Sequence, residues 1–274
     1  MTVLGRDGRQ IVESGDKVAD ETLRAAFLLA YDLRHQLVSE GEQKSILLVG
    51  NQDWPLPIPL VQRKGAWQFD TQAGKEEVLY RRVGRNELGA IQVCLAYVDA
   101  QNEYATLNPQ KTGPASYAQR IISSPDKKDG LYWPAAANEP QSPFGEAMAL
   151  ATLQGYRAGL TPIPYHGYYY KILTGQGRTA PGGALDYVVK GNMIGGFALV
   201  AYPAEYGNSG VMTFLVNHTG AENVAHRVRH EDVQSRPHLE ARAGRRPGVE
   251  LRASQESWCG RRDSNPHEVT LNGF

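Results

Sequence analysis

The chain of 274 residues is 41% hydrophobic and 21% charged, a composition typical of a soluble globular protein with one large domain or two ordinary ones. Its 29 basic residues balance 29 acidic residues, so no basic excess indicates a nucleic-acid-binding surface. No apolar run approaches the roughly 20 residues that cross a bilayer, and the start lacks the apolar core of a secretory signal. We therefore expect no nucleic-acid partner, no transmembrane segment in this chain and a cytoplasmic location as encoded.

Residues 1–80 predict a small, incomplete α+β unit. Apolar side chains three and four positions apart over residues 23–38 predict an amphipathic helix. Residues 45–49 form a short apolar strand. Residues 58–62 and 66–70 flank a glycine turn and predict a β-hairpin.

Residues 81–220 predict a long helix packed on an antiparallel sheet. Helices are expected over residues 74–80, 86–104 and 144–156. The apolar stripe of the second helix comprises Leu88, Ile91, Leu95 and Val98, with Cys94 and Tyr97 beside it. Four runs rich in aromatic and β-branched residues predict strands at 168–173, 185–189, 196–202 and 211–217. Because the connections are short, we expect an antiparallel β-meander, and the fold class is α+β.

Residues 221–274 differ in composition from the rest of the chain. They contain nine arginines but no lysine, isoleucine or tyrosine, and their apolar residues follow no period. A segment without such a period does not build a core, so this tail is predicted to be disordered. We favour the alternative that it is non-native, because WCGRRDSNPH (258–267) is typical of translated non-coding or out-of-frame DNA.

Three motifs that suggest cofactor, nucleophile or metal chemistry lack the context that this chemistry needs. GQGRTA (175–180) has dinucleotide-fingerprint spacing, but the following Pro-Gly-Gly prevents the helix that would hold a pyrophosphate. YGNSG (206–210) lacks the spacing of a nucleophile elbow. His226 and His230 have the spacing of two zinc ligands on a helix, without a third ligand. We therefore expect no cofactor and no metal.

No pair of carboxylates is held together by the sequence, although acid–base catalysis needs a partner within reach. The carboxylates considered are Asp53, Asp70, Asp99, Asp129, Asp186 and Glu205. No catalytic residue is assigned, and a non-enzyme is favoured over an enzyme. The two cysteines, Cys94 and Cys259, are expected to be free thiols.

Aromatic side chains provide the candidate binding surface. On a strand, Tyr168 and Tyr170 share one face and Tyr169 takes the other, so one set is expected in the core. The other set, with a histidine at its edge, has the composition of an interface. The candidate partner or ligand surface comprises Trp54, Trp133, Tyr165, His166, Tyr168 and Tyr169.

Several passages, in order, resemble the bacterial domain-of-unknown-function family twenty-nine-fifty over about residues 3–220. They include LLVGNQDWPLPIPLV (47–61), RRVGRNELGAIQVCLAYVDAQNEYA (81–105), YHGYYYKILTGQG (165–177) and SGVMTFLVNHTG (209–220). The resemblance implies no established activity and suggests a periplasmic or secreted protein. Family members begin with an export signal and a further helix, and continue with a last strand after the VNH-x-G motif. This chain resembles the family in neither respect. The two departures predict an N-terminal truncation and a frameshift after Gly220.

A second resemblance concerns architecture. A long helix followed by GYYYKI (167–172), FALVAYPAEYG (197–207) and GVMTFLVN (210–217) is similar to the soluble head of pilin-like proteins. Some such heads bind calcium, but NPQKTG (108–113) stands where family members have an acidic loop, so no metal is carried over. The helix-then-hairpin order of residues 1–80 resembles cystatin-like and nuclear-transport-factor-2-like folds.

Two hypotheses for function follow. The first is a non-catalytic bacterial envelope protein that binds an envelope partner or assembles through its sheet and aromatic face. The second is an enzyme or small-ligand receptor, with a pocket at the domain junction near Trp54, Trp133 and His166.

Overall fold

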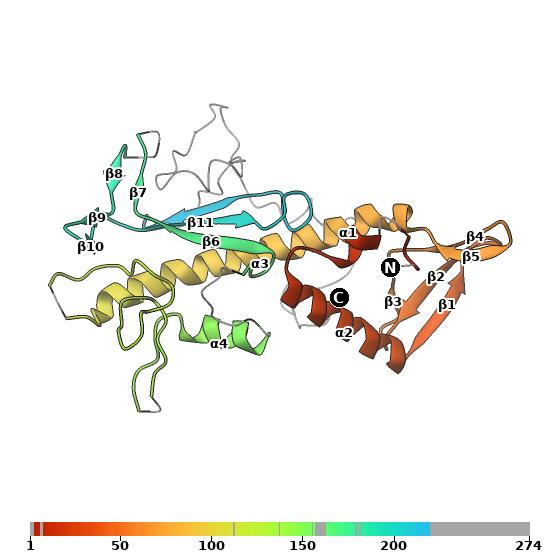
Figure 1. The fold of residues 1–274 in the computed structure, drawn as a ribbon, viewed down its shortest axis with the longest axis horizontal. Coiled ribbons are helices and arrows are strands. Elements are labelled where there is room, and N and C mark those ends of the chain that lie inside the picture. The colour runs from red at the N-terminus through yellow and green to blue at the C-terminus, as the bar shows by residue number, and fades with distance from the viewer. Residues whose placement is uncertain are drawn as a thin grey trace.

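The structure, a computed structural model, describes residues 3–5, 8–111, 113–136, 138–154, 156, 163–178, 180 and 182–219. The predicted tail, with His226, His230 and Cys259, lies outside these residues. One helix, α3 (Thr71–Leu107), runs along the molecule. A five-stranded sheet lies beside its N-terminal end, and a three-stranded sheet packs along its later turns (Figure 1). This arrangement confirms the α+β class.

The N-terminal elements are two helices and an antiparallel sheet with strand order β1-β2-β4-β5, in which β3 also pairs with β2. The elements are α1 (Gly8–Val12), α2 (Lys17–Leu33), β1 (His35–Ser39), β2 (Lys44–Val49), β3 (Trp54–Pro55), β4 (Leu60–Arg63) and β5 (Ala66–Phe69). The hairpin β4-β5 confirms the prediction for residues 58–70. The prediction of helix as far as residue 38 was wrong. The chain turns extended at Arg34 because β1 pairs along its whole length with β2, and this pairing overrides the helical spacing.

Helix α3 replaces the two helices predicted at 74–80 and 86–104, and it crosses the predicted unit boundary at residue 80 without a break. Asp70 caps its first turn by accepting a hydrogen bond from the Ala73 amide (3.4 Å), and Asn108 ends it in the left-handed conformation. Between the two predicted segments, Gly84 has the lowest helix propensity. Its cost of about 1 kcal/mol is too small to interrupt a helix that packs at both ends.

The C-terminal sheet has three strands, not the four that were predicted. The antiparallel order is β12-β11-β6, from β6 (Tyr168–Leu173), β11 (Ala198–Pro203) and β12 (Phe214–Asn217). Residues 185–189 do not join this sheet, and two short strands lie on either side of the buried Tyr187. These strands belong to hairpins that project from the end of the sheet (Figure 1): β7 (Gly175–Gln176) with β8 (Leu185–Asp186), and β9 (Val188–Val189) with β10 (Asn192–Met193).

The core lies between α3 and the three-stranded sheet. Helix α4 (Gly145–Leu153), which was predicted, adds a partly buried face to it. The predicted stripe of α3 was wrong by part of a turn, since Leu88 and Leu95 are exposed. The side chains that face the sheet are small or aromatic, and they are Ala90, Cys94, Tyr97, Ala100, Gln101 and Tyr104. The alanines let the strands approach the helix, and the tyrosines fill the remaining volume. Tyr97 packs edge-on against Phe197, with ring centroids 5.7 Å apart.

Two glycines of α3 provide a matched test of helix packing. A Cβ at Gly74 would lie 2.7 Å from the Ile58 Cα and the Pro57 carbonyl oxygen, which are backbone atoms, whereas a Cβ at Gly84 meets nothing within 4 Å. We expect Gly74→Ala to lower the free energy of unfolding by about 1–3 kcal/mol. Gly84→Ala should raise it by up to about 1 kcal/mol. Urea unfolding measures the free energy of unfolding of both variants. Equal stability of the two would contradict the close packing of α3 on residues 57–58.

Candidate functional site

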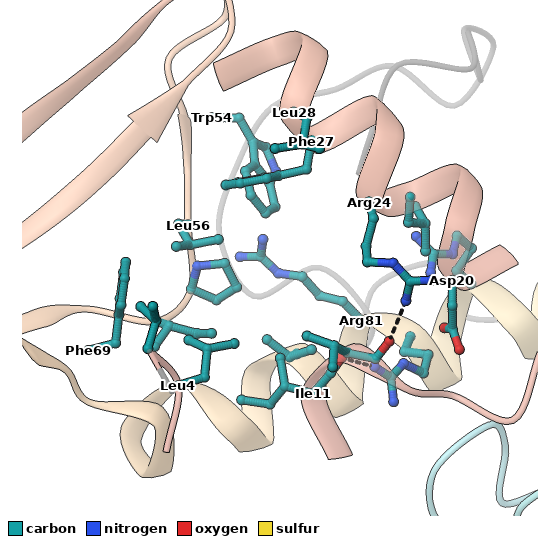
Figure 2. Close-up of a pocket in the computed structure, with 18 residues that line it drawn as sticks. Leu4, Ile11, Asp20, Arg24, Phe27, Leu28, Trp54, Leu56, Phe69 and Arg81 are labelled. Carbon is teal, nitrogen blue, oxygen red and sulfur yellow. Dashed lines mark hydrogen bonds between the residues drawn. The ribbon is translucent and has the colours of Figure 1, made fainter. Parts of the chain in front are cut away.

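The described residues enclose a pocket of about 500 Å³ between α2, the five-stranded sheet, the N-terminal segment and the first turns of α3 (Figure 2). Its apolar wall includes Leu23, Phe27 and Leu28 from α2, and Leu56, Ile58 and Phe69 from the sheet side. An amphipathic helix ordinarily buries its apolar stripe. In α2 only Asp20 is buried, and Leu28 remains 58% exposed. The helix is thus held over the sheet with a hollow between them.

Arginine side chains form the polar part of this pocket. Arg24 extends from α2, and Arg81, Arg82 and Arg85 come from two successive turns of α3. Arg82 is buried and donates to the carbonyl of Gln10 (3.0 Å), to that of Ile11 and to the Asn208 side chain. It therefore ties α1 and the β11–β12 loop to α3, and its role is structural.

The other three arginines keep hydrogen-bond donors available. Arg81 donates from Nε to Glu77 (2.6 Å), and its guanidinium lies 5.5 Å from the centroid of the Trp54 ring. Figure 2 shows Arg81 reaching across the pocket between Trp54 and Leu56. Arg24 donates to the Val12 carbonyl (3.2 Å). Within the described part of the chain, Arg85, an exposed residue, makes neither a hydrogen bond nor an ion pair. Partial desolvation lowers its pKa, although the charge of Asp20 opposes this.

A buried carboxylate joins the start of α2 to the C-terminal sheet. Asp16 is 1% exposed, and its Oδ1 caps α2 by accepting from the Ala19 amide (3.1 Å). Its Oδ2 accepts from the Tyr156 hydroxyl (2.7 Å) and from the Gly167 amide (3.1 Å). Burial and the neighbouring Asp16 carboxylate both raise the pKa of Tyr156. Tyr156 therefore stays a neutral donor.

The structure separates the aromatic residues that the sequence grouped together. Trp54 lines the pocket, whereas Trp133 is buried against Tyr104 near the far end of α3. Since Trp54 meets α3 at Arg81, the two tryptophans lie roughly 35 Å apart along the helix axis. The pocket therefore lacks Trp133, and His166 does not line it either.

The tyrosines of β6 and the residues before it have structural contacts. Tyr168 is 0% exposed and donates to the Met212 carbonyl (3.0 Å), so its side chain belongs to the core. Tyr169 is half-buried beside Tyr202. Tyr165 packs edge-on against Tyr156 and also touches the ring of His166, so both lie at the Asp16 junction. The role of this set as a partner surface stays a prediction.

The carboxylates singled out by type have structural partners where the contacts are known. Asp53 pairs with Arg34 (3.3 Å) and Asp70 with Arg63 (2.7 Å), while Asp129 accepts from the Ser124 amide (2.7 Å). Across the described ranges, no group of three His, Cys, Asp or Glu side chains is placed to hold a metal ion. In the same ranges, no helix is both long and apolar enough to span a membrane.

The thiol of Cys94 is buried in the core between α3 and the three-stranded sheet. Burial raises its pKa to about 12.

The sequence analysis did not single out the arginines of the pocket, although the run Arg81-Arg82-x-x-Arg85 puts three cations on successive turns of one helix.

Comparison with known proteins identifies a family and nothing closer. A family model with the description "Protein of unknown function (DUF2950)" matches residues 1–225. No curated protein matches the chain, and no solved structure matches it.

The hydrogen bonds of Asp16 predict that loss of this one carboxylate strongly lowers the stability of the fold. Asp16→Ala should lower the free energy of unfolding by about 2 kcal/mol or more, because it removes the helix cap and leaves two buried donors without an acceptor. Asp32→Ala, at an exposed position of the same helix, should change it by less than about 0.5 kcal/mol. Denaturant titration measures both, and a mild effect at Asp16 would contradict this account of the junction.

His166 predicts a pH dependence of stability. Burial lowers its pKa from the ordinary 6.5, although Asp16 opposes the shift, so the unfolded chain binds the proton more readily than the folded protein does. The stability that His166 contributes is present above about pH 6.5 and is lost as pH falls below that value. His166→Asn keeps a residue type that tolerates the local φ of 51° and removes the titration. Unfolding at about pH 7 and about pH 5 should show a smaller loss for this variant than for the wild type. Identical losses would contradict the assignment.

Proposed function

The chain belongs to the DUF2950 family, and we propose that it is a non-catalytic binding protein for one small, largely apolar molecule. The ligand lies in the pocket between α2, the five-stranded sheet and α3. This proposal develops the small-ligand hypothesis and places the ligand beside Trp54 alone.

The pocket itself is the observation that carries the proposal. Its volume of about 500 Å³ falls within the range of roughly 300–1,000 Å³ that is usual for small-molecule sites. Thirteen of the 18 lining residues are apolar, so water in the pocket finds few hydrogen-bond partners. An apolar hollow of this kind is better filled by an apolar molecule than by water.

The polar residues of the pocket support binding rather than chemistry. Among the described residues that line it, none is Ser, Thr, Cys, His, Lys or Tyr. The single carboxylate, Asp20, is buried and accepts a hydrogen bond from the Ser14 amide (2.9 Å). A nucleophile with a base, or an acid with a base, is the usual requirement for catalysis. The pocket offers neither pair.

A second candidate function, assembly with a partner protein, is favoured by the outer face of the same unit. Every residue of β1 is exposed, and Leu37 is 61% and Leu29 of α2 72% exposed. Exposed apolar side chains beside a strand edge that no described strand covers suit another chain. The resemblance of the sequence to pilin-like heads also supports an assembly role. We also propose a bacterial envelope location, which rests on the resemblance to exported family members alone.

A cavity-filling substitution tests the proposed function. Leu23→Trp adds an indole to the pocket wall, and Leu153→Trp makes the same change on α4, where the side chain is 86% exposed. With Nile red as a neutral apolar probe, we expect binding by the wild type and by Leu153→Trp. The affinity of Leu23→Trp for Nile red should be lower by about tenfold or more. No binding by the wild type, or equal binding by all three proteins, would contradict the proposal.

A further inference from the structure

We infer that the ligand is an anionic amphiphile with a single apolar chain and a terminal carboxylate, which Arg24, Arg81 and Arg85 bind. The inference rests on the proposed function and adds the charge and the chemical class of the ligand. It follows from the charge of the pocket, the availability of donors, the geometry of α3 and the size of the hollow.

The pocket has an excess of positive charge. The described part of its lining contains four arginines and one carboxylate, Asp20. Asp20 is occupied by the Ser14 amide, and within the described residues it lies within ion-pair distance of none of the four arginines. Glu77 lies outside the lining and pairs with Arg81 through Nε alone. The positive charge of the pocket is therefore only partly neutralised.

Three of the arginines have donors for a ligand. A guanidinium carries five N–H donors in a planar fork. Arg82 donates through both of its terminal nitrogens, to Gln10, Ile11 and Asn208. Arg81 uses Nε and Arg24 uses one terminal nitrogen, whereas no described residue takes a hydrogen bond from Arg85. The terminal nitrogens of Arg81 and Arg85 are thus free to bind both oxygens of a carboxylate.

These three arginines come from two elements that border the hollow. Arg81 and Arg85 are four residues apart on α3, so they lie one above the other on the same face. Arg24 approaches from α2, on the other side of the hollow, and Figure 2 shows it directed away from its helix toward the segment that holds Ile11. Burial lowers the pKa of Arg82, the charge of Asp20 opposes this shift, and the nearby charge of Arg85 adds to it. A bound carboxylate relieves this repulsion.

The rest of the pocket determines the shape of the ligand. Phe27, Leu28 and Leu56 offer contacts to hydrocarbon, and the described lining residues carry no hydroxyl or imidazole group that would recognise a sugar or a base. A hollow of about 500 Å³ lies in the lower half of the usual range for small-molecule sites. It suits one chain rather than the two chains of a phospholipid. A fatty-acid-like molecule meets all of these requirements.

The test compares twelve-carbon probes that differ only in the head group. Dodecanoate, dodecanol, dodecylamine and dodecyl phosphate displace Nile red from the full chain at neutral pH. We expect the affinity for dodecanoate to be higher than that for dodecanol by about tenfold or more, and dodecylamine to bind most weakly. Equal affinity for dodecanol and dodecanoate would overturn the inference and leave the proposed function standing. Failure of every probe, Nile red included, would overturn both. Tighter binding of dodecyl phosphate would overturn the assignment of a carboxylate.

Arginine variants test whether these side chains bind the head group of the probe. Arg85→Gln should weaken dodecanoate about tenfold and leave dodecanol unchanged, because no described residue depends on the Arg85 donors. Arg120→Gln, at an exposed position that binds Ser124, is the matched control and should change neither probe. If Arg85→Gln does not fold, Arg24→Gln on the exposed face of α2 serves instead. Equal losses for dodecanoate and dodecanol would show a structural role and contradict the inference.

Discussion

The buried carboxylate of Asp16 is the constraint on which the arrangement of the two ends of the protein depends. One oxygen starts α2, and the other binds Tyr156 and the backbone immediately before β6. A buried charge is costly unless hydrogen bonds satisfy it, and three donors do so here. Together with Arg82, which holds α1 and the β11–β12 loop, this junction fixes where α2 begins. The Gly50 amide, which donates to the carbonyls of Ala30 and Arg34, holds the other end of α2 to the sheet, so the two attachments together place α2 over the hollow.

The hollow has an energetic cost that a ligand offsets. A core without its filling side chains loses dispersion contacts, and the loss grows with the empty volume. α2 carries an apolar face, yet Leu28 and Leu33 are more than half exposed. A molecule that binds only the folded protein stabilises it by mass action. The pocket and its arginines are therefore best explained together, as an apolar site with one charged end.

Local sequence patterns predicted the helices and strands that are determined by residues close together in the chain. Strand β6 was predicted with its exact bounds, the hairpin β4-β5 follows its glycine turn, and α4 follows its apolar run. β1 was missed because its residues continue a helical spacing, and only pairing with β2 makes them a strand. The buried face of α3 was misplaced because leucine counts favour Leu88 and Leu95. The sheet instead needs the close approach that Ala90 and Ala100 allow.

The candidate site was harder to predict because it is assembled from distant segments. Trp54 was named, but its neighbour Arg81 belongs to a helix that begins after two further strands. The sequence grouped Trp54 with Trp133, since both precede a proline, and α3 holds them at opposite ends. Asp16 showed no distinguishing feature, since its partners Tyr156 and Gly167 lie far along the chain.

The most direct test of a carboxylate-binding pocket beneath α2 is methyl NMR of the leucine-labelled chain during titration with dodecanoate. The account predicts that the methyl resonances of Leu23, Leu28 and Leu56 shift together and saturate at one equivalent. Those of Leu153 on α4 and Leu173 on β6 should stay in place. Unchanged resonances at the three pocket leucines, or shifts confined to the exposed leucines of β1 and α4, would contradict it.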